Sequence, residues 1–259
     1  PVAKVLAHAG THQAEYQVWL ATPGSDAAFV GAAWSELKRT LTFSALRFKF
    51  LPNAALANTL LTVDGMRECS HVRSHRRPLL NLDADAVKAS FAKKSNKSRA
   101  NRLKRLGKIE FRRLTDPADL DLIFDKLIAF YDFRQGAVNS STPFRDDPDK
   151  RSFHRELLVN GKSGAYITAT FLNGEPIAAF WGAESGDIVH LGMLFYSPFL
   201  AEHSPGKLHI MELSEQLLLD NKTVLDLTPG GDDWKERFAN AHDEVAEVVL
   251  YPSALARQR

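Results

Sequence analysis

The amino-acid sequence predicts an α/β (α+β) protein with a mixed, mostly antiparallel sheet flanked by helices. Two observations lead to this fold class. Three stretches of strand length lie between residues 165 and 196, separated only by short turns, as in an antiparallel meander. One helix pattern then leads to a further apolar strand at residues 223–227. A crossover helix after a meander places parallel and antiparallel strands in one sheet.

The composition is that of an ordinary globular protein. Of the 259 residues, 44% are hydrophobic, enough for one large or two small domains. The net charge of +2 gives no polybasic signal, and the single cysteine, Cys69, excludes a disulfide framework. No apolar run approaches the roughly 18 residues of a membrane span, and residues 1–10 lack the form of a signal peptide. We therefore expect a cytoplasmic protein without a transmembrane segment.

The first 80 residues have mixed α/β character. Residues 15–21 (EYQVWLA) are rich in strand formers, and residues 46–51 (LRFKFL) alternate as a strand does. Between them the sequence predicts a helix whose apolar side carries Phe29, Val30, Ala33, Trp34 and Leu37.

A basic segment follows at residues 93–113, with ten Lys and Arg residues against one acid, Glu110. Asp83 or Asp85 can cap a helix here and Gly107 can end it. One interpretation is a solvated helix that bridges two lobes. The other is a patch for an anionic partner, such as phosphates, RNA or a membrane surface.

A second helix is expected directly after this segment. Asp116 is a suitable N-cap and Pro117 fits the first helical position. Apolar residues then recur at helical spacing, at Leu120, Ile123, Phe124, Leu127 and Tyr131. A short helix is expected around residues 153–159.

The last third of the chain contains the predicted meander and crossover. Asn173-Gly174 is a strong two-residue hairpin turn. The expected strands cover residues 165–172, 175–183, 187–196, 223–227 and 244–251. The crossover helix carries Leu208, Met211, Leu213, Leu217 and Leu218, and a Gly-rich loop at 228–233 precedes a helical turn at 234–238.

The order strand, loop, helix, strand occurs twice, in residues 16–51 and 188–228. We interpret the repeat as a duplicated half-domain. It predicts a truncated or degenerate lobe at 1–80 and a complete domain at 81–259.

Two C-terminal segments resemble a known family. Tyr196 to Leu213 (YSPFLAEHSPGKLHIMEL) is similar to the loop-helix signature of the CelD-like (cellulose-biosynthesis acetyltransferase-like) branch of the GNAT acyltransferases, which is related to the Fem peptidyltransferases. Leu225 to Phe238 (LDLTPGGDDWKERF) resembles the second signature of that branch. The usual basic-x-x-Gly-x-Gly/Ala run of the GNAT pyrophosphate loop is absent, and Ser204-Pro-Gly-Lys207 stands in its place.

The resemblance implies a GNAT-like fold and an acyl-CoA donor, with acetyl-CoA as the first choice. Ser204 to Lys207 opens a helix, whose free N–H groups and positive dipole end attract phosphate. Gly206 would let a phosphate approach the backbone, and Lys207 adds a charge. A plain helix start is the alternative interpretation.

In a GNAT fold the two central strands splay apart and the acyl group lies between them. Here those strands are 190–196 and 224–227, so Leu194 is expected to contact the donor through its backbone. His190 and Asp226 are candidate bases for the amine, and Tyr196 is a candidate acid for the leaving thiolate. Each of the three has a structural alternative, and a water chain can replace a direct base.

Three further residues are candidates for substrate binding. Asp232 and Lys235 follow the last crossover strand and could hold a polar acceptor or a donor phosphate. Alternatively, Asp232 caps the turn and Lys235 pairs with it. Glu212 lies inside the crossover helix, where it could line the cleft or anchor the loop. No metal site is expected, because Cys69, His71 and His75 lack a fourth ligand nearby.

The sequence leads to three functional hypotheses. The first is an N-acyltransferase that moves an acyl group from acyl-CoA to an amine of a small molecule, an amino sugar or a polysaccharide precursor. The second is a Fem-like aminoacyl-tRNA-dependent transferase, in which the basic segment would bind RNA. The third is a GNAT-fold interaction module without catalysis. The oligomeric state is not predicted.

Overall fold

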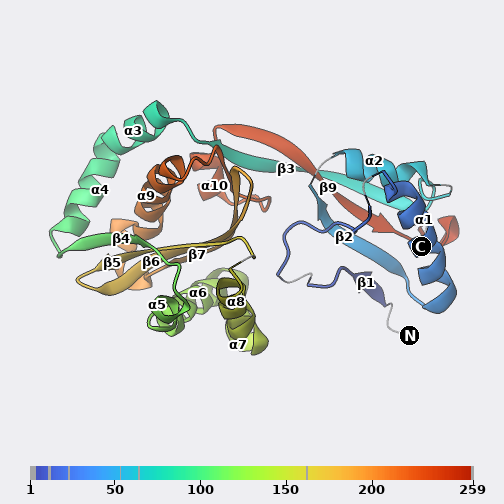
Figure 1. The fold of residues 1–259 in the computed structure, drawn as a ribbon, viewed down its shortest axis with the longest axis horizontal. Helices are drawn as coiled ribbons and strands as arrows, with labels where there is room; N and C mark the ends of the chain where they lie inside the picture. The colour runs from blue at the N-terminus through green and yellow to red at the C-terminus, as the bar shows by residue number, and fades with distance from the viewer. Residues whose placement is uncertain are drawn as a thin grey trace. The chain divides into compact units, whose positions relative to one another are not determined.

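The computed structural model describes residues 4–10, 13–22, 24–52, 54–63, 65–161 and 163–257 (Figure 1). The chain divides into two compact units. The first consists of residues 1–78, 228–237 and 241–259, and the second of residues 79–227 and 238–240. The first unit therefore draws on both ends of the chain. The predicted truncated lobe at 1–80 stays a prediction.

The nine strands of the described chain form one mixed sheet, which confirms the predicted fold class. Their order is β1-β2-β9-β3-β8-β7-β6-β5-β4. The pairs β1–β2 and β7–β8 are parallel, whereas β2–β9, β3–β8, β4–β5, β5–β6 and β6–β7 are antiparallel. Within the second unit the meander consists of β4 (Ile109–Arg113), β5 (Ala165–Leu172), β6 (Glu175–Ser185) and β7 (Ile188–Tyr196). The end of β3 (Ser70–Asn81) pairs with β8 (Val224–Asp226).

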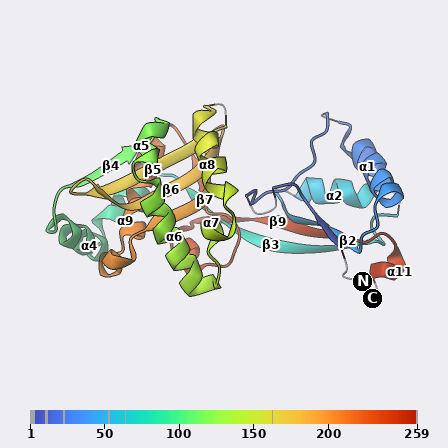
Figure 2. The same cartoon turned by 90° about the horizontal axis from the view of Figure 1, so that it is seen from below.

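One face of this meander is covered by four helices, as Figure 2 shows. They are α5 (Pro117–Asp121), α6 (Phe124–Asn139), α7 (Pro143–Asp146) and α8 (Asp149–Val159). The predicted cap is present, since Asp116 accepts a hydrogen bond from the Ala118 N–H and Pro117 begins α5. The predicted apolar stripe packs on the sheet, and Phe124 stacks on Trp181 at 5.5 Å between ring centroids.

The opposite face carries α3 (Ala84–Ala92), α4 (Lys94–Lys104) and α9 (Pro205–Leu219). The prediction of a single helix for the basic segment is wrong. Lys93 has extended backbone (φ −56°, ψ 128°) and divides it into α3 and α4. Asp83 caps α3 as predicted. Gly107 lies three residues beyond α4, with φ 155°, where an added Cβ would collide with the Asn173 side chain.

The hairpin turn and one bulge shape the meander. Asn173 and Gly174 both have positive φ, 52° and 82°, as the predicted two-residue turn requires. Between β6 and β7 the register shifts, so that Gly192 is the extra residue of a β-bulge. A Cβ at Gly192 would lie 2.9 Å from the Trp181 carbonyl oxygen, so only glycine fits without displacement.

The first unit packs α1 (Asp26–Thr40) and α2 (Ala54–Thr62) against β2 (Ala45–Leu51) and β9 (Ala241–Leu250). Short elements complete it, namely β1 (Val5–Ala7), residues 233–237 of α10 (Asp233–Phe238) and α11 (Ala254–Arg257).

The strand expected at residues 15–21 is wrong. In that segment Gln17 bonds to the backbone of β2, since its N–H donates to the Phe50 carbonyl and its side-chain oxygen accepts from the Lys49 N–H. Further contacts with β2 are made by side chains, with Glu15 paired to Lys49 and the Trp19 ring edge-on to Phe48. A single bridging residue does not form a ladder. Within the described ranges, no helix is both long and apolar enough to cross a membrane.

Candidate active site

The second unit has a parallel strand pair that parts halfway. β7 pairs with β8 only from Ile188 to His190, opposite Val224 to Asp226. β8 then ends, whereas β7 continues to Tyr196. Six residues at about 3.3 Å each leave roughly 20 Å of strand edge along β7. No strand among the described residues pairs with that edge.

His190 and Asp226 meet at the point where the strands part. His190 Nδ1 lies 2.9 Å from Asp226 Oδ2. The Asp226 side chain is 1% exposed and that of His190 is 28% exposed. An ionised carboxylate only accepts hydrogen bonds, so Nδ1 carries the proton and the basic lone pair is on Nε2. The pair thus has the arrangement of a general base and its orienting carboxylate.

Tyr196 does not join this pair. It lies six residues further along β7, and its ring packs against Gly206 at the start of α9. The structure thus brings together two of the three predicted catalytic residues. At its position Tyr196 can line a bound donor, and its predicted role as the thiolate acid stays a prediction.

The start of α9 faces the same end of β7. Ser204 has left-handed backbone (φ 53°, ψ 54°), and its carbonyl accepts the N–H groups of Lys207 (3.0 Å) and Leu208 (3.2 Å). The Ser204 side chain makes no capping hydrogen bond. Gly206 is buried. A Cβ at this position would lie 2.8 Å from the Tyr196 ring. The glycine therefore admits the tyrosine ring, whereas phosphate binding at Ser204, Gly206 and Lys207 stays a prediction.

His203 is a candidate that the sequence reasoning missed. It precedes Ser204 and is buried. Its Nε2 lies 3.3 Å from a Glu202 carboxylate oxygen, but its Nδ1 is buried without a hydrogen-bond partner among the described residues. Buried ring nitrogens are normally satisfied, so a ligand at this helix start could supply the partner. The sequence signal for His203 was its position inside the first family signature, Tyr196 to Leu213.

Arg134 is the second missed residue. Its Nη2 donates a hydrogen bond of 3.0 Å to the Leu194 carbonyl oxygen on β7. This bond uses one of the backbone groups that were predicted to contact the donor. The signal in the sequence was helical spacing, because Arg134 continues the apolar stripe of Leu127 and Tyr131.

Glu212 is bound to the sheet. Its carboxylate accepts a hydrogen bond of 3.0 Å from the Thr170 hydroxyl, which also lies 2.8 Å from His209 Nδ1. His209 Nε2 is 3.0 Å from the Thr168 hydroxyl. Burial raises the pKa of Glu212 and lowers that of His209 to about 3. These contacts anchor α9 on β5, and a substrate role for Glu212 stays a prediction.

Lys235 is buried inside the Gly-rich loop that follows β8 in sequence. Its Nζ lies 3.2 Å from both oxygens of Thr228 and from the Pro229 carbonyl, and 3.3 Å from Asp232 Oδ2. The ammonium thereby stabilises the conformation of the loop. Its contact with Asp232 agrees with the alternative interpretation that these two residues pair with each other. Substrate binding by Asp232 and Lys235 stays a prediction.

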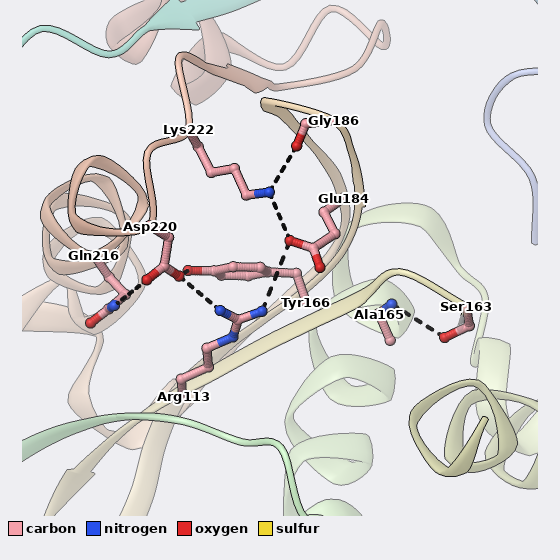
Figure 3. Close-up of polar contacts among 9 residues, drawn as sticks. All are labelled: Arg113, Ser163, Ala165, Tyr166, Glu184, Gly186, Gln216, Asp220 and Lys222. Atoms are coloured by element: carbon pink, nitrogen blue, oxygen red, sulfur yellow. Dashed lines mark hydrogen bonds and ion pairs between the residues drawn. The ribbon is translucent and has the colours of Figure 1, made fainter. Parts of the chain in front are cut away.

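At the opposite end of the meander lies a second polar cluster (Figure 3). Asp220 accepts hydrogen bonds from the Tyr166 hydroxyl (2.7 Å) and from Arg113 (2.9 Å). Lys222 pairs with Glu184 at 2.9 Å. Burial and the bond to Asp220 raise the pKa of Tyr166 far above its usual value. Every charged group of this cluster has a partner of opposite sign.

A meander, a crossover helix and a parallel pair that parts beside the start of that helix together define the GNAT-like acyltransferase fold expected from the resemblance. The model of the acetyltransferase (GNAT) domain family matches residues 90–236, more than half of the chain. The chain belongs to this family. Among curated proteins, none matches the sequence.

Solved structures share the fold at low sequence identity. The C-terminal domain (DUF2156) of a proposed lysylphosphatidylglycerol synthetase from Agrobacterium fabrum aligns with a TM-score of 0.61 at 13% identity, over 89% of this chain and 76% of that one. L-PGS from Bacillus licheniformis gives 0.58 at 10% identity, over 91% and 77%. FemX gives 0.55 at 10% identity, over 89% and 78%. At these identities the likeness concerns the fold alone.

Proposed function

We propose that the chain is an N-acyltransferase that moves an acyl group, acetyl in the first instance, from acyl-CoA to an amine. The observation that carries the proposal is the parting of β7 and β8 with the His190–Asp226 pair at its apex. A donor whose phosphates lie at the start of α9 would extend its arm along the free edge of β7. Its thioester would then reach the apex.

The chemistry follows from this placement. His190 Nε2 takes a proton from the acceptor amine as the nitrogen attacks the thioester carbonyl, and Asp226 stabilises the imidazolium that forms. The C–S bond then breaks, and the thiolate receives the proton that the His190 imidazolium holds, which restores the neutral imidazole. The acceptor is an amine of a small molecule, an amino sugar or a polysaccharide precursor.

The decisive measurement is isothermal titration of the chain with acetyl-CoA and with a longer acyl-CoA. We expect binding to the wild type and a loss of roughly 10- to 100-fold in affinity for Lys207→Glu, since a charge-assisted contact to phosphate becomes repulsive. Lys38→Glu, with the same charge change on the exposed side of α1, is the control and should bind normally. A folded wild type that binds neither CoA would overturn the proposal.

A second candidate is an aminoacyl-tRNA-dependent transferase, and α4 is the observation that favours it. This helix contains no acid, and Lys94, Lys97 and Arg102 are exposed without an ion pair in the described part of the chain. α4 contacts η1 (Pro198–His203) and α9, so its charges flank the start of α9. The name lysylphosphatidylglycerol synthetase, which the structural neighbour from Agrobacterium fabrum bears, also states an aminoacyl product.

The same titration separates the two candidates. If tRNA binds and acyl-CoA does not, the second candidate replaces the first. The affinity of the chain for tRNA should then fall steeply as the salt concentration rises. In the double variant Lys94→Glu/Lys97→Glu, the slope of log affinity against log salt concentration should become less steep by about 0.7–0.9 per lost phosphate contact.

A further inference from the structure

Arg134 of α6 lies against the edge of β7 that β8 leaves unpaired. Its Nη2 donates to the Leu194 carbonyl at 3.0 Å. The guanidinium carbon lies 5.2 Å from the centroid of the Tyr131 ring and 5.1 Å from that of the Tyr196 ring. A guanidinium near two aromatic rings is held in orientation by cation–π attraction. The group is therefore preorganised beside the gap between the strands.

The positive charge of Arg134 has no counterion among the described residues. No carboxylate lies within ion-pair distance, and Nε is buried without a hydrogen-bond partner. Two other arginines of this unit differ, because Arg113 pairs with Asp220 and Arg155 with Asp121. Arg134 is half-buried, and a charge that is partly withdrawn from water without a counterion is unfavourable. A ligand anion would remove that cost.

We propose that Arg134 binds a carboxylate of the substrate that lies between the parted strands. A guanidinium presents its N–H groups in one plane and matches a planar carboxylate better than any other side chain does. Phosphate is the weaker choice, because the donor phosphates are assigned to the start of α9. The contact deepens the proposed function and rests on it for the reaction, but the carboxylate binding itself can be measured separately.

The carboxylate has two potential sources. It can belong to the acceptor, which is then an amino acid or a similar amine with a neighbouring carboxylate. It can also belong to the acyl group, which is then a dicarboxylic acyl such as succinyl. In both cases Arg134 is a specificity-determining residue that contacts the part of the substrate lying along the unpaired edge of β7.

The test uses product-like probes that need no CoA. N-acetyl amino acids are compared with their carboxamides, and succinamate is compared with butyramide. Each probe is titrated into the full chain, into Arg134→Gln and into Lys126→Gln. Lys126 lies two residues after the start of the same helix and forms an exposed ion pair with Glu175, so it controls for loss of charge. Thermal unfolding verifies that each variant is folded.

The wild type should bind at least one carboxylate probe roughly 10- to 100-fold more tightly than its uncharged partner, as expected for hydrogen bonds to a charged group. Arg134→Gln should lose this preference and Lys126→Gln should keep it. A preference among N-acetyl amino acids assigns the carboxylate to the acceptor, and one for succinamate assigns it to the acyl group.

The proposal is overturned if the wild type shows no preference in either series, or if Lys126→Gln loses it equally. If Arg134→Gln does not fold, Arg134→Lys replaces it, since lysine keeps the charge but lacks the planar fork and should weaken the preference. Titration with acetyl-CoA runs in parallel. A chain that shows the carboxylate preference but binds no acyl-CoA would contradict the proposed function and retain this inference.

Discussion

The two ends of the meander in the second unit differ in whether their buried polar groups have hydrogen-bond partners. At one end, Tyr166, Arg113 and Asp220 bond to one another, and Lys222 pairs with Glu184 (Figure 3). At the other end, where β7 and β8 part, Arg134 Nε and His203 Nδ1 are buried with no partner in the described ranges.

This difference separates buried polar groups that stabilise the fold from those that are available to a ligand. A buried polar network whose members satisfy one another rigidifies the fold and leaves nothing for a ligand. A buried donor or acceptor without a partner costs about 1–3 kcal/mol, so such a group beside a candidate site is a candidate for contact with a ligand. We call the end with the Asp220 cluster the closed end and the end where β7 and β8 part the open end. Substitutions at the closed end should therefore lower stability, and substitutions at the open end should lower activity.

The largest expected effect is that of Asp226→Asn at the open end. The amide cannot stabilise an imidazolium on His190 as a carboxylate does, so the rate of acyl transfer should fall about 100-fold or more. The rate is measured with acetyl-CoA and the best acceptor from a panel of amines. The free energy of unfolding should change far less, because asparagine can still bond to the ring.

An unchanged rate for Asp226→Asn, in a variant that binds acetyl-CoA normally, would show that a water chain and not His190 removes the proton. His190→Gln should then be equally harmless.

Asp220→Ala at the closed end should have the next largest effect, on stability. It leaves the Tyr166 hydroxyl buried without its acceptor and Arg113 without its main partner, so urea unfolding should show a loss of about 2–3 kcal/mol. Affinity for acetyl-CoA, measured in the folded variant, should stay unchanged. Tyr166→Phe should lose only about 1 kcal/mol, since Arg113 and Gln216 still satisfy Asp220.

If Asp220→Ala abolished CoA binding while the protein remained folded, the separation of the two ends would be wrong.

The smallest effect concerns acid stability and a third buried group, His154. Both of its ring nitrogens are buried without a partner among the residues described, next to Trp181 and Phe144. Burial, followed by the charge of Lys150, lowers its pKa to about 3. Between pH 6.5 and 3 the unfolded state therefore binds a proton that the folded state does not, so stability falls as the pH falls.

His154→Phe should remove this loss. Relative to the wild type, the variant should gain roughly 1 kcal/mol when the pH is lowered from 7.5 to 5.5, as measured by urea unfolding at both values. His209, whose pKa is also lowered to about 3, keeps its part of the acid sensitivity in both proteins. Equal acid sensitivity of the two proteins would contradict a neutral, buried His154.

The sequence predicted the regular parts of the second unit well, for a physical reason. Strand β5 was predicted with both ends correct, and the Asn173-Gly174 turn and the Asp116 cap were also correct. These features depend on the period of apolar residues and on local backbone preference, which a single sequence displays. The expected strand at 15–21 failed, because strand pairing needs a partner and residue type alone does not supply one.

The site divides in the same way. The sequence alone indicated the family, the parting strands and the residues His190 and Asp226, because the two signatures are contiguous along the chain. Only the tertiary structure decided that the two side chains meet, that Tyr196 does not join them, and that Glu212 is bound to the sheet. It also brought Arg134 and His203 to the open end. Burial and hydrogen-bond satisfaction depend on neighbours distant in sequence, so no local pattern could have displayed them.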